Sequence, residues 1–129
     1  MKSKKRKKIV TALLLLILLG CGSKSDSSGV SFVSIDVSPP SPSIISFPYT
    51  QQFTAIARDS SGNGVSGVVF TWSDSGPASC IDQKTGLASA KQTFGTDTIT
   101  ATAGNIAGST PLFINTNGSA PPPPPPNCL

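Results

Sequence analysis

Short runs in which apolar and polar residues alternate are the feature of this sequence that most constrains its fold. Between Val30 and Ile114 no apolar period of 3.6 residues is visible, and Gly, Pro, Asn and Asp separate the alternating runs. About seven runs can be distinguished, at residues 33–38, 53–58, 68–73, 79–82, 87–90, 98–103 and 112–114. One face of these runs is apolar and the other is largely Thr and Ser, which is typical of strands packed face to face in two sheets. We therefore expect residues 31–115 to form an all-β antiparallel sandwich.

The runs also contain an ordered series of short motifs. In chain order these are VSIDVSP (33–39), QFTA (52–55), Asp59 followed by GNGV (62–65), FTWS (70–73), ID (81–82), TGL (85–87), Ala90, GT (95–96) and ITAT (99–102). The series resembles the bacterial immunoglobulin-like domain, group 2, over about residues 31–115. The resemblance implies an immunoglobulin-like Greek-key sandwich, which serves as an extracellular module in adhesins, surface proteins and some phage proteins. Cys80 departs from the family pattern, where a Thr or similar residue is more usual.

The start of the chain is a basic segment followed by an apolar run and a Gly-Cys pair. Six of the first eight residues are Lys or Arg, and Ile9–Leu19 is uncharged and rich in Leu. This run is too short to cross a bilayer as a helix, which takes roughly 20 residues. It fits the h-region of a secretory signal. The sequence LLGC at residues 18–21 resembles the lipobox of bacterial lipoproteins, with a less common Leu at position 19.

The lipobox resemblance implies that residues 1–20 are a signal peptide and that Cys21 becomes a lipidated N-terminus. Several acyl chains, such as palmitate, would anchor the protein stably, whereas one chain holds it only marginally. Residues 21–30 are rich in Ser and Gly and would form a flexible tether. Gly22 stands where an Asp would favour the inner membrane, so we expect a lipid-anchored protein of the bacterial cell envelope, at the outer membrane. The alternative is an uncleaved anchor with a chance cysteine.

The charge of the whole chain comes largely from this signal. The net charge is +4, but six of the ten basic residues precede Cys21. The remaining chain has four basic residues against six aspartates. It contains no cluster of Lys or Arg that could bind phosphates, which argues against a nucleic-acid partner.

No reactive site is visible in the sequence. The chain has no His, the commonest general base and metal ligand, and its aspartates are scattered without paired carboxylates. Asp59–Gly64 begins like a calcium loop, but Phe70 occupies the position of the closing Glu. This segment therefore predicts a solvated hairpin turn. We expect neither an enzyme nor a cofactor or metal site.

Three aromatic positions could bind a ligand. Trp72 could stack against a sugar, but its alternation with Val68 and Phe70 predicts a core residue. Phe47 and Tyr49 flank Pro48 ahead of a strand and form at most a weak, partly exposed patch.

Cys80 and Cys128 are the cysteines that remain if Cys21 is lipidated. An extracytoplasmic compartment permits disulfides. Because Ile81 should point inward, Cys80 should point outward and be accessible. Cys128 follows Pro121–Pro126, a polyproline II rod of roughly 19 Å that could carry it away from the domain. An intramolecular disulfide, an intermolecular one and free thiols all stay open.

Residues 116–129 form a Pro-rich tail that is either a terminal spacer or the end of a shortened relative of a longer protein. Together these features predict a non-catalytic module for cell-surface interaction or adhesion, with a surface protein or glycan as partner. The alternatives are a carbohydrate-binding module and a passive structural spacer from a truncated multidomain surface protein.

Overall fold

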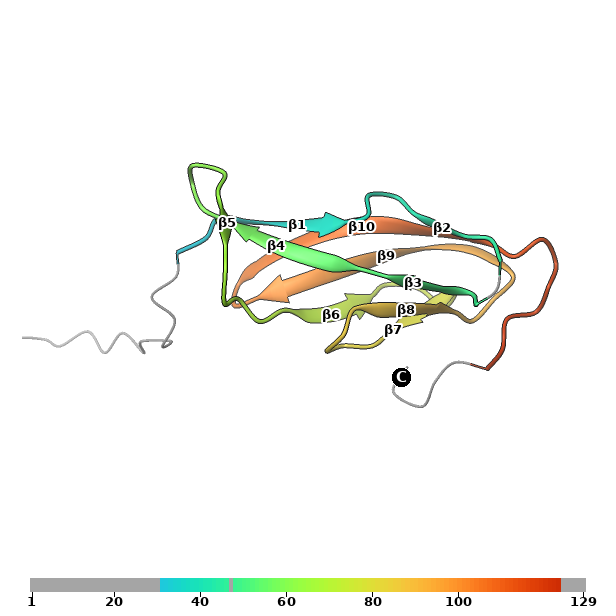
Figure 1. Ribbon diagram of the computed structural model, residues 1–129. Coiled ribbons are helices and arrows are strands. Elements are labelled where there is room, and N and C mark those ends of the chain that lie inside the picture. The colour runs from blue at the N-terminus through green and yellow to red at the C-terminus, as the bar shows by residue number, and fades with distance from the viewer. Residues whose placement is uncertain (1–30, 47, 124–129) are drawn as a thin grey trace, which may run out of the picture.

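This computed structural model describes residues 31–46 and 48–123, which contain ten β-strands and no helix (Figure 1). The strands are β1 (Ser34–Ser38), β2 (Ser43–Ile44), β3 (Thr50–Gln52), β4 (Thr54–Arg58), β5 (Gly64–Val65), β6 (Thr71–Asp74), β7 (Ser79–Ile81), β8 (Leu87–Ala90), β9 (Phe94–Ala103) and β10 (Ile106–Asn115). Within these residues, no helix is long and apolar enough to cross a membrane. The predicted signal peptide (1–20), the whole tether (21–30), Phe47 and residues 124–129, which include Cys128, lie outside the described residues.

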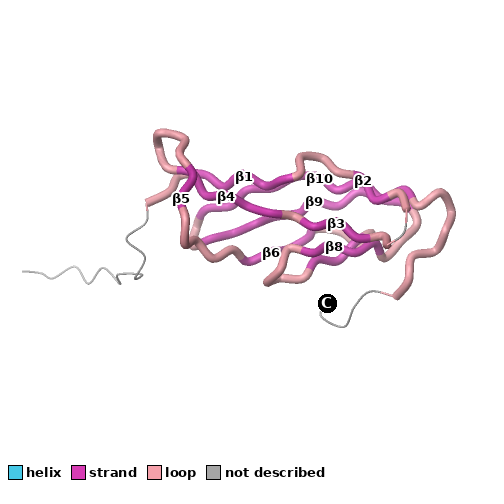
Figure 2. Tube along the Cα trace, viewed as in Figure 1, coloured by secondary structure: helices cyan, strands magenta, loops and turns pink. Residues whose placement is uncertain are grey.

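The strands form two layers of a β-sandwich. One layer has the order β2-β10-β9-β6, in which only the β2–β10 pair is parallel. The other contains two hydrogen-bonded groups, β1-β4-β5 and β3-β8-β7. Only Phe53 separates β3 from β4, so the two groups follow one another along the same layer (Figures 1 and 2). The predicted all-β sandwich is confirmed.

The described chain has more strands than the seven runs predicted. β2 and β5 are two residues long, which is too short for an alternating pattern to be recognised. β3 has the sequence TQQ, which contains no apolar residue and so cannot alternate. It lies at the edge of its group, where it is paired with β8. All three strands therefore lack the apolar alternation on which the sequence prediction depends.

The core lies between the layers and is built from the apolar faces that alternation predicted. Ile35, Phe53, Trp72, Ile99 and Leu112 are each at most 6% exposed. The half-buried residues Val37, Ala55, Val68 and Phe70 pack against them. The inward assignment is therefore confirmed for these residues. It is wrong for Val33, which shares the phase of Ile35 but is 56% exposed just before β1.

Candidate functional site

The outer face of the β2-β10-β9-β6 layer carries two exposed aromatic rings. Phe94 is 76% exposed and Phe113 is 43% exposed. In the β9–β10 register Phe94 lies opposite Asn115, and Phe113 lies opposite Thr96. The two rings are therefore diagonal neighbours on one face, a separation that aromatic side chains can bridge.

Hydroxyl side chains cover the rest of this face. The side chains of β9 and its partners that share the phase of Phe94 are uncharged, and most are Thr or Ser. We call this surface the hydroxyl face, and it comprises Thr71, Ser73, Phe94, Thr96, Thr98, Thr100, Thr102, Ser109 and Phe113. Hydroxyl groups donate and accept hydrogen bonds, while aromatic rings supply apolar contact area. Such a face suits contact with a neutral polar partner.

Sequence reasoning missed the two Phe residues, although the alternation contains the signal. Phe94 is in phase with Thr96 and Thr98, which point to solvent, and out of phase with the buried Ile99. Phe113 lies between the buried residues Leu112 and Ile114. A two-residue period therefore places both rings outside.

A cluster of two carboxylates and one hydroxyl lies at the other side of β9, with Asp97 and Ser79 buried and Asp74 half-buried. Asp97, 2% exposed, accepts hydrogen bonds from the Ser79 backbone N–H and from Ser79 Oγ, both at 2.6 Å. Ser79 Oγ also lies 3.5 Å from Asp74 Oδ2. The expectation that no carboxylates are paired is thus wrong, because the fold brings together residues far apart in sequence. Asp97 shares the phase of the buried Ile99, which was the available signal.

The chemistry of this cluster is that of a structural contact. Burial raises the pKa of Asp74, and the nearby Asp97 carboxylate adds to the rise. Ser79 is fully buried, so no substrate reaches its hydroxyl. The cluster instead joins β9 to Ser79, the first residue of β7.

The Asp59 loop is the turn of the β4–β5 hairpin, as predicted. Asp59 Oδ1 accepts hydrogen bonds from the backbone N–H groups of Ser61 and Asn63, at 2.8 and 2.9 Å. These bonds, led by that from Asn63, lower the pKa of Asp59. Its carboxylate is thus engaged within its own loop, and the described residues contain no group of three or more potential metal ligands.

Trp72 is a core residue, as its alternation predicted. It is 4% exposed, and its ring lies 6.3 Å from that of Phe53, tilted by 43°. It cannot form an exposed platform with Tyr49. Tyr49 is half-buried and packs partly against the core.

Cys80 differs from its predicted state. By register it lies opposite Ser89, on the outer face of the β7–β8 pair, as expected. Its side chain is nevertheless only 2% exposed, so the expected accessibility is wrong. Cys80 is disulfide-bonded, and its partner lies outside the described residues. Pairing with Cys128 stays a prediction, as does the lipidation of Cys21.

In comparisons with known proteins, no protein-family model and no curated protein matches this chain.

Proposed function

We propose that this protein is a lipid-anchored, extracytoplasmic lipoprotein whose immunoglobulin-like module makes non-catalytic contacts at the cell surface. The observation that carries the interaction role is the exposed Phe94–Phe113 pair on the hydroxyl face. A large exposed aromatic residue costs solubility unless a partner covers it, and exposed apolar patches often mark interaction sites.

The composition of the hydroxyl face supports a neutral partner. Aromatic residues are enriched at the centres of protein interfaces, and charged residues are depleted there. The hydroxyl face has this composition, with two rings and no charged side chain among its members. A surface protein of the host or of a neighbouring cell fits it.

A carbohydrate-binding module is the second candidate, and Phe94 favours it. A ring that is 76% exposed can stack against a sugar, with neighbouring hydroxyls positioned to hydrogen-bond the glycan. This candidate requires Phe94 but does not require Phe113.

The sequence at residues 1–21 supports the anchor. A basic segment, a short apolar run and LLGC precede a Ser- and Gly-rich stretch that ends where the sandwich begins. If Cys21 is acylated, radiolabelled palmitate should enter the wild type and Cys80→Ser but not Cys21→Ser. Equal labelling of Cys21→Ser would contradict the anchor.

The interaction role can be tested with a screen of glycans and matrix proteins. The wild type should bind at least one partner in the screen. The Phe94→Ser/Phe113→Ser variant should bind that partner with an affinity lower by at least about tenfold, or about 1.4 kcal/mol. Ile56→Ser is the matched control, because Ile56 is 47% exposed but lies on β4 in the other layer. Binding lost with Phe94→Ser alone, and only to glycans, would favour the carbohydrate module. Binding to nothing would favour the passive spacer.

A further inference from the structure

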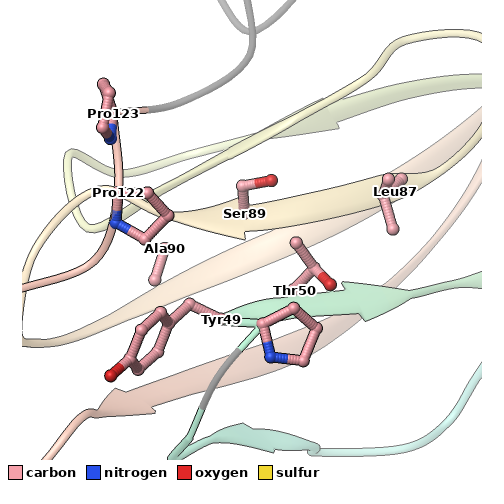
Figure 3. Close-up of a pocket in the computed structure, with 8 residues that line it drawn as sticks. Tyr49, Thr50, Leu87, Ser89, Ala90, Pro122 and Pro123 are labelled. Carbon is pink, nitrogen blue, oxygen red and sulfur yellow. The ribbon is translucent and has the colours of Figure 1, made fainter.

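A cavity of about 160 Å³ lies on the outer side of β3 and β8 (Figure 3). Three segments line it, as the close-up shows: Tyr49 just before β3, Leu87 and Ser89 on β8, and Pro122 and Pro123 of the C-terminal segment. The tail therefore lies beside the sandwich at these two prolines. We call the surface of the sandwich that faces them, formed by Tyr49, Leu87 and Ser89, the groove.

A turn after β10 directs the tail toward this groove. Thr116 is 2% exposed, and its backbone N–H donates to the carbonyl oxygen of Thr93 at 2.9 Å. Asn117 and Gly118 both have positive φ, 53° and 80°, and the Ser119 N–H donates to the Thr116 carbonyl oxygen at 3.0 Å. The chain thus reverses immediately before its six prolines.

Tyr49 holds an uncommon backbone conformation at the groove. Its φ of 62° lies in the left-handed region, which bulky residues seldom adopt. Two hydrogen bonds of 2.9 Å fix it, from its own N–H to the Ser46 carbonyl oxygen and from the Ala90 N–H to its carbonyl oxygen. Strain of this kind persists only where the surrounding structure imposes it. An aromatic ring fixed beside prolines is the arrangement by which domains bind polyproline II segments.

Cys80 lies next to the same groove. Its register partner Ser89 lines the cavity, and Cys80 itself is buried and disulfide-bonded. Cys128 is five residues beyond Pro123, and five residues can span at most about 17 Å. Neighbouring strands are only about 4.8 Å apart, so this length is ample to reach β7 from β8.

We propose that the groove is a binding site for a polyproline II segment, that its resident occupant is the chain's own tail at Pro122 and Pro123, and that a Cys80–Cys128 disulfide holds the tail there. The proposal does not depend on the lipid anchor or on the hydroxyl face. A small-molecule dithiol reduces the Cys80–Cys128 disulfide in two exchange steps and thereby frees the tail. One dithiol thiolate attacks the disulfide, its second thiolate displaces the other cysteine, and the dithiol leaves as a cyclic disulfide. Two electrons and two protons then reside on the thiols of Cys80 and Cys128.

Peptide mapping of the full chain without reductant tests the Cys80–Cys128 disulfide. We expect a Cys80–Cys128 peptide pair from one molecule. A Cys80–Cys21 pair, or a Cys80 peptide joined to a second molecule, would overturn the proposal.

The groove is tested with a synthetic hexaproline peptide, and Tyr49 is the reporter because it is the only Tyr in the chain. In the oxidised wild type the peptide should leave the Tyr49 ring resonances unchanged. In the full chain with Gly and Ser alternating at positions 121–126, the peptide should shift them saturably. Adding Leu87→Ser to that chain should weaken binding at least fivefold, whereas adding Phe94→Ser should not.

Two results would overturn the groove assignment: no shift in the chain with the replaced tail, or the same shift with a Gly-Ser hexapeptide. Trp72 emission shows whether each variant is folded. If the replaced chain does not fold, Cys128→Ser keeps the prolines and serves instead. Its Tyr49 resonances should respond to the peptide, and no response would also overturn the assignment.

Discussion

Among the single residues, Trp72 has the largest side chain in a small core. It packs against Phe53 and is the only Trp in the chain. Removing this side chain leaves a cavity between the layers, so Trp72→Ala should lower the free energy of unfolding by about 3–5 kcal/mol. Urea titrations followed by circular dichroism measure the loss. Native Trp72 emission should be blue-shifted, and emission typical of exposed Trp would contradict its position.

Two aspartates should give the stability opposite pH dependences. Burial raises the pKa of Asp74, so the folded chain holds this proton more tightly than the unfolded chain. The contribution of Asp74 to the free energy of unfolding is present below the ordinary Asp pKa, and it is lost as pH rises through the pKa of the folded state. The hydrogen bond from the Thr85 backbone lowers the pKa of Asp82. The contribution of Asp82 to the free energy of unfolding is present above the ordinary Asp pKa, and it is lost as pH falls through the pKa of the folded state.

Urea titrations between about pH 3 and about pH 7 separate these effects. With rising pH, the stability of the wild type relative to Asp74→Asn should fall, and its stability relative to Asp82→Asn should rise. The same sign for both variants would contradict the assignment.

At the scale of elements, the turn between β7 and β8 depends on Gly86. Its φ is 72°, and an added Cβ would lie 2.7 Å from Trp72 Cε2 and 2.9 Å from the Phe53 carbonyl oxygen. Gly86→Ala should therefore cost about 2–4 kcal/mol, from backbone strain and overpacking together.

Gly104 is the matched control for this turn. It also has positive φ, 59°, in the β9–β10 turn, but no atom lies within 4 Å of an added Cβ. Gly104→Ala should cost about 1 kcal/mol, from the backbone alone. Thermal unfolding compares the two variants, and equal losses would show that contact with Trp72 does not matter.

At the scale of the whole molecule, Asp97 links the two layers. It lies on β9, while Ser79, which donates two hydrogen bonds to it, lies on β7 in the opposite layer. Asp97→Ala leaves both buried donors without this acceptor and should cost about 2–4 kcal/mol. Asp36→Ala removes only an exposed ion pair with Arg58 and should cost at most about 1 kcal/mol. Similar losses in denaturant unfolding would argue against a link between the layers.

The class of the fold and the orientation of its main strands follow from the amino-acid sequence. Alternation placed Trp72 and Ile99 inside, and Asp59 to Gly64 predicted the β4–β5 turn. These features follow from a period of two and from local turn chemistry, which need only neighbouring residues.

What covers each face of a strand became visible in the folded molecule. The Asp74–Ser79–Asp97 cluster joins residues that are far apart in sequence, and Pro122 and Pro123 lie beside β8. Alternation predicted that Cys80 faces outward, yet it could not show that this face is buried. A strand's period specifies the side on which a residue lies, whereas burial also depends on which distant segment packs there.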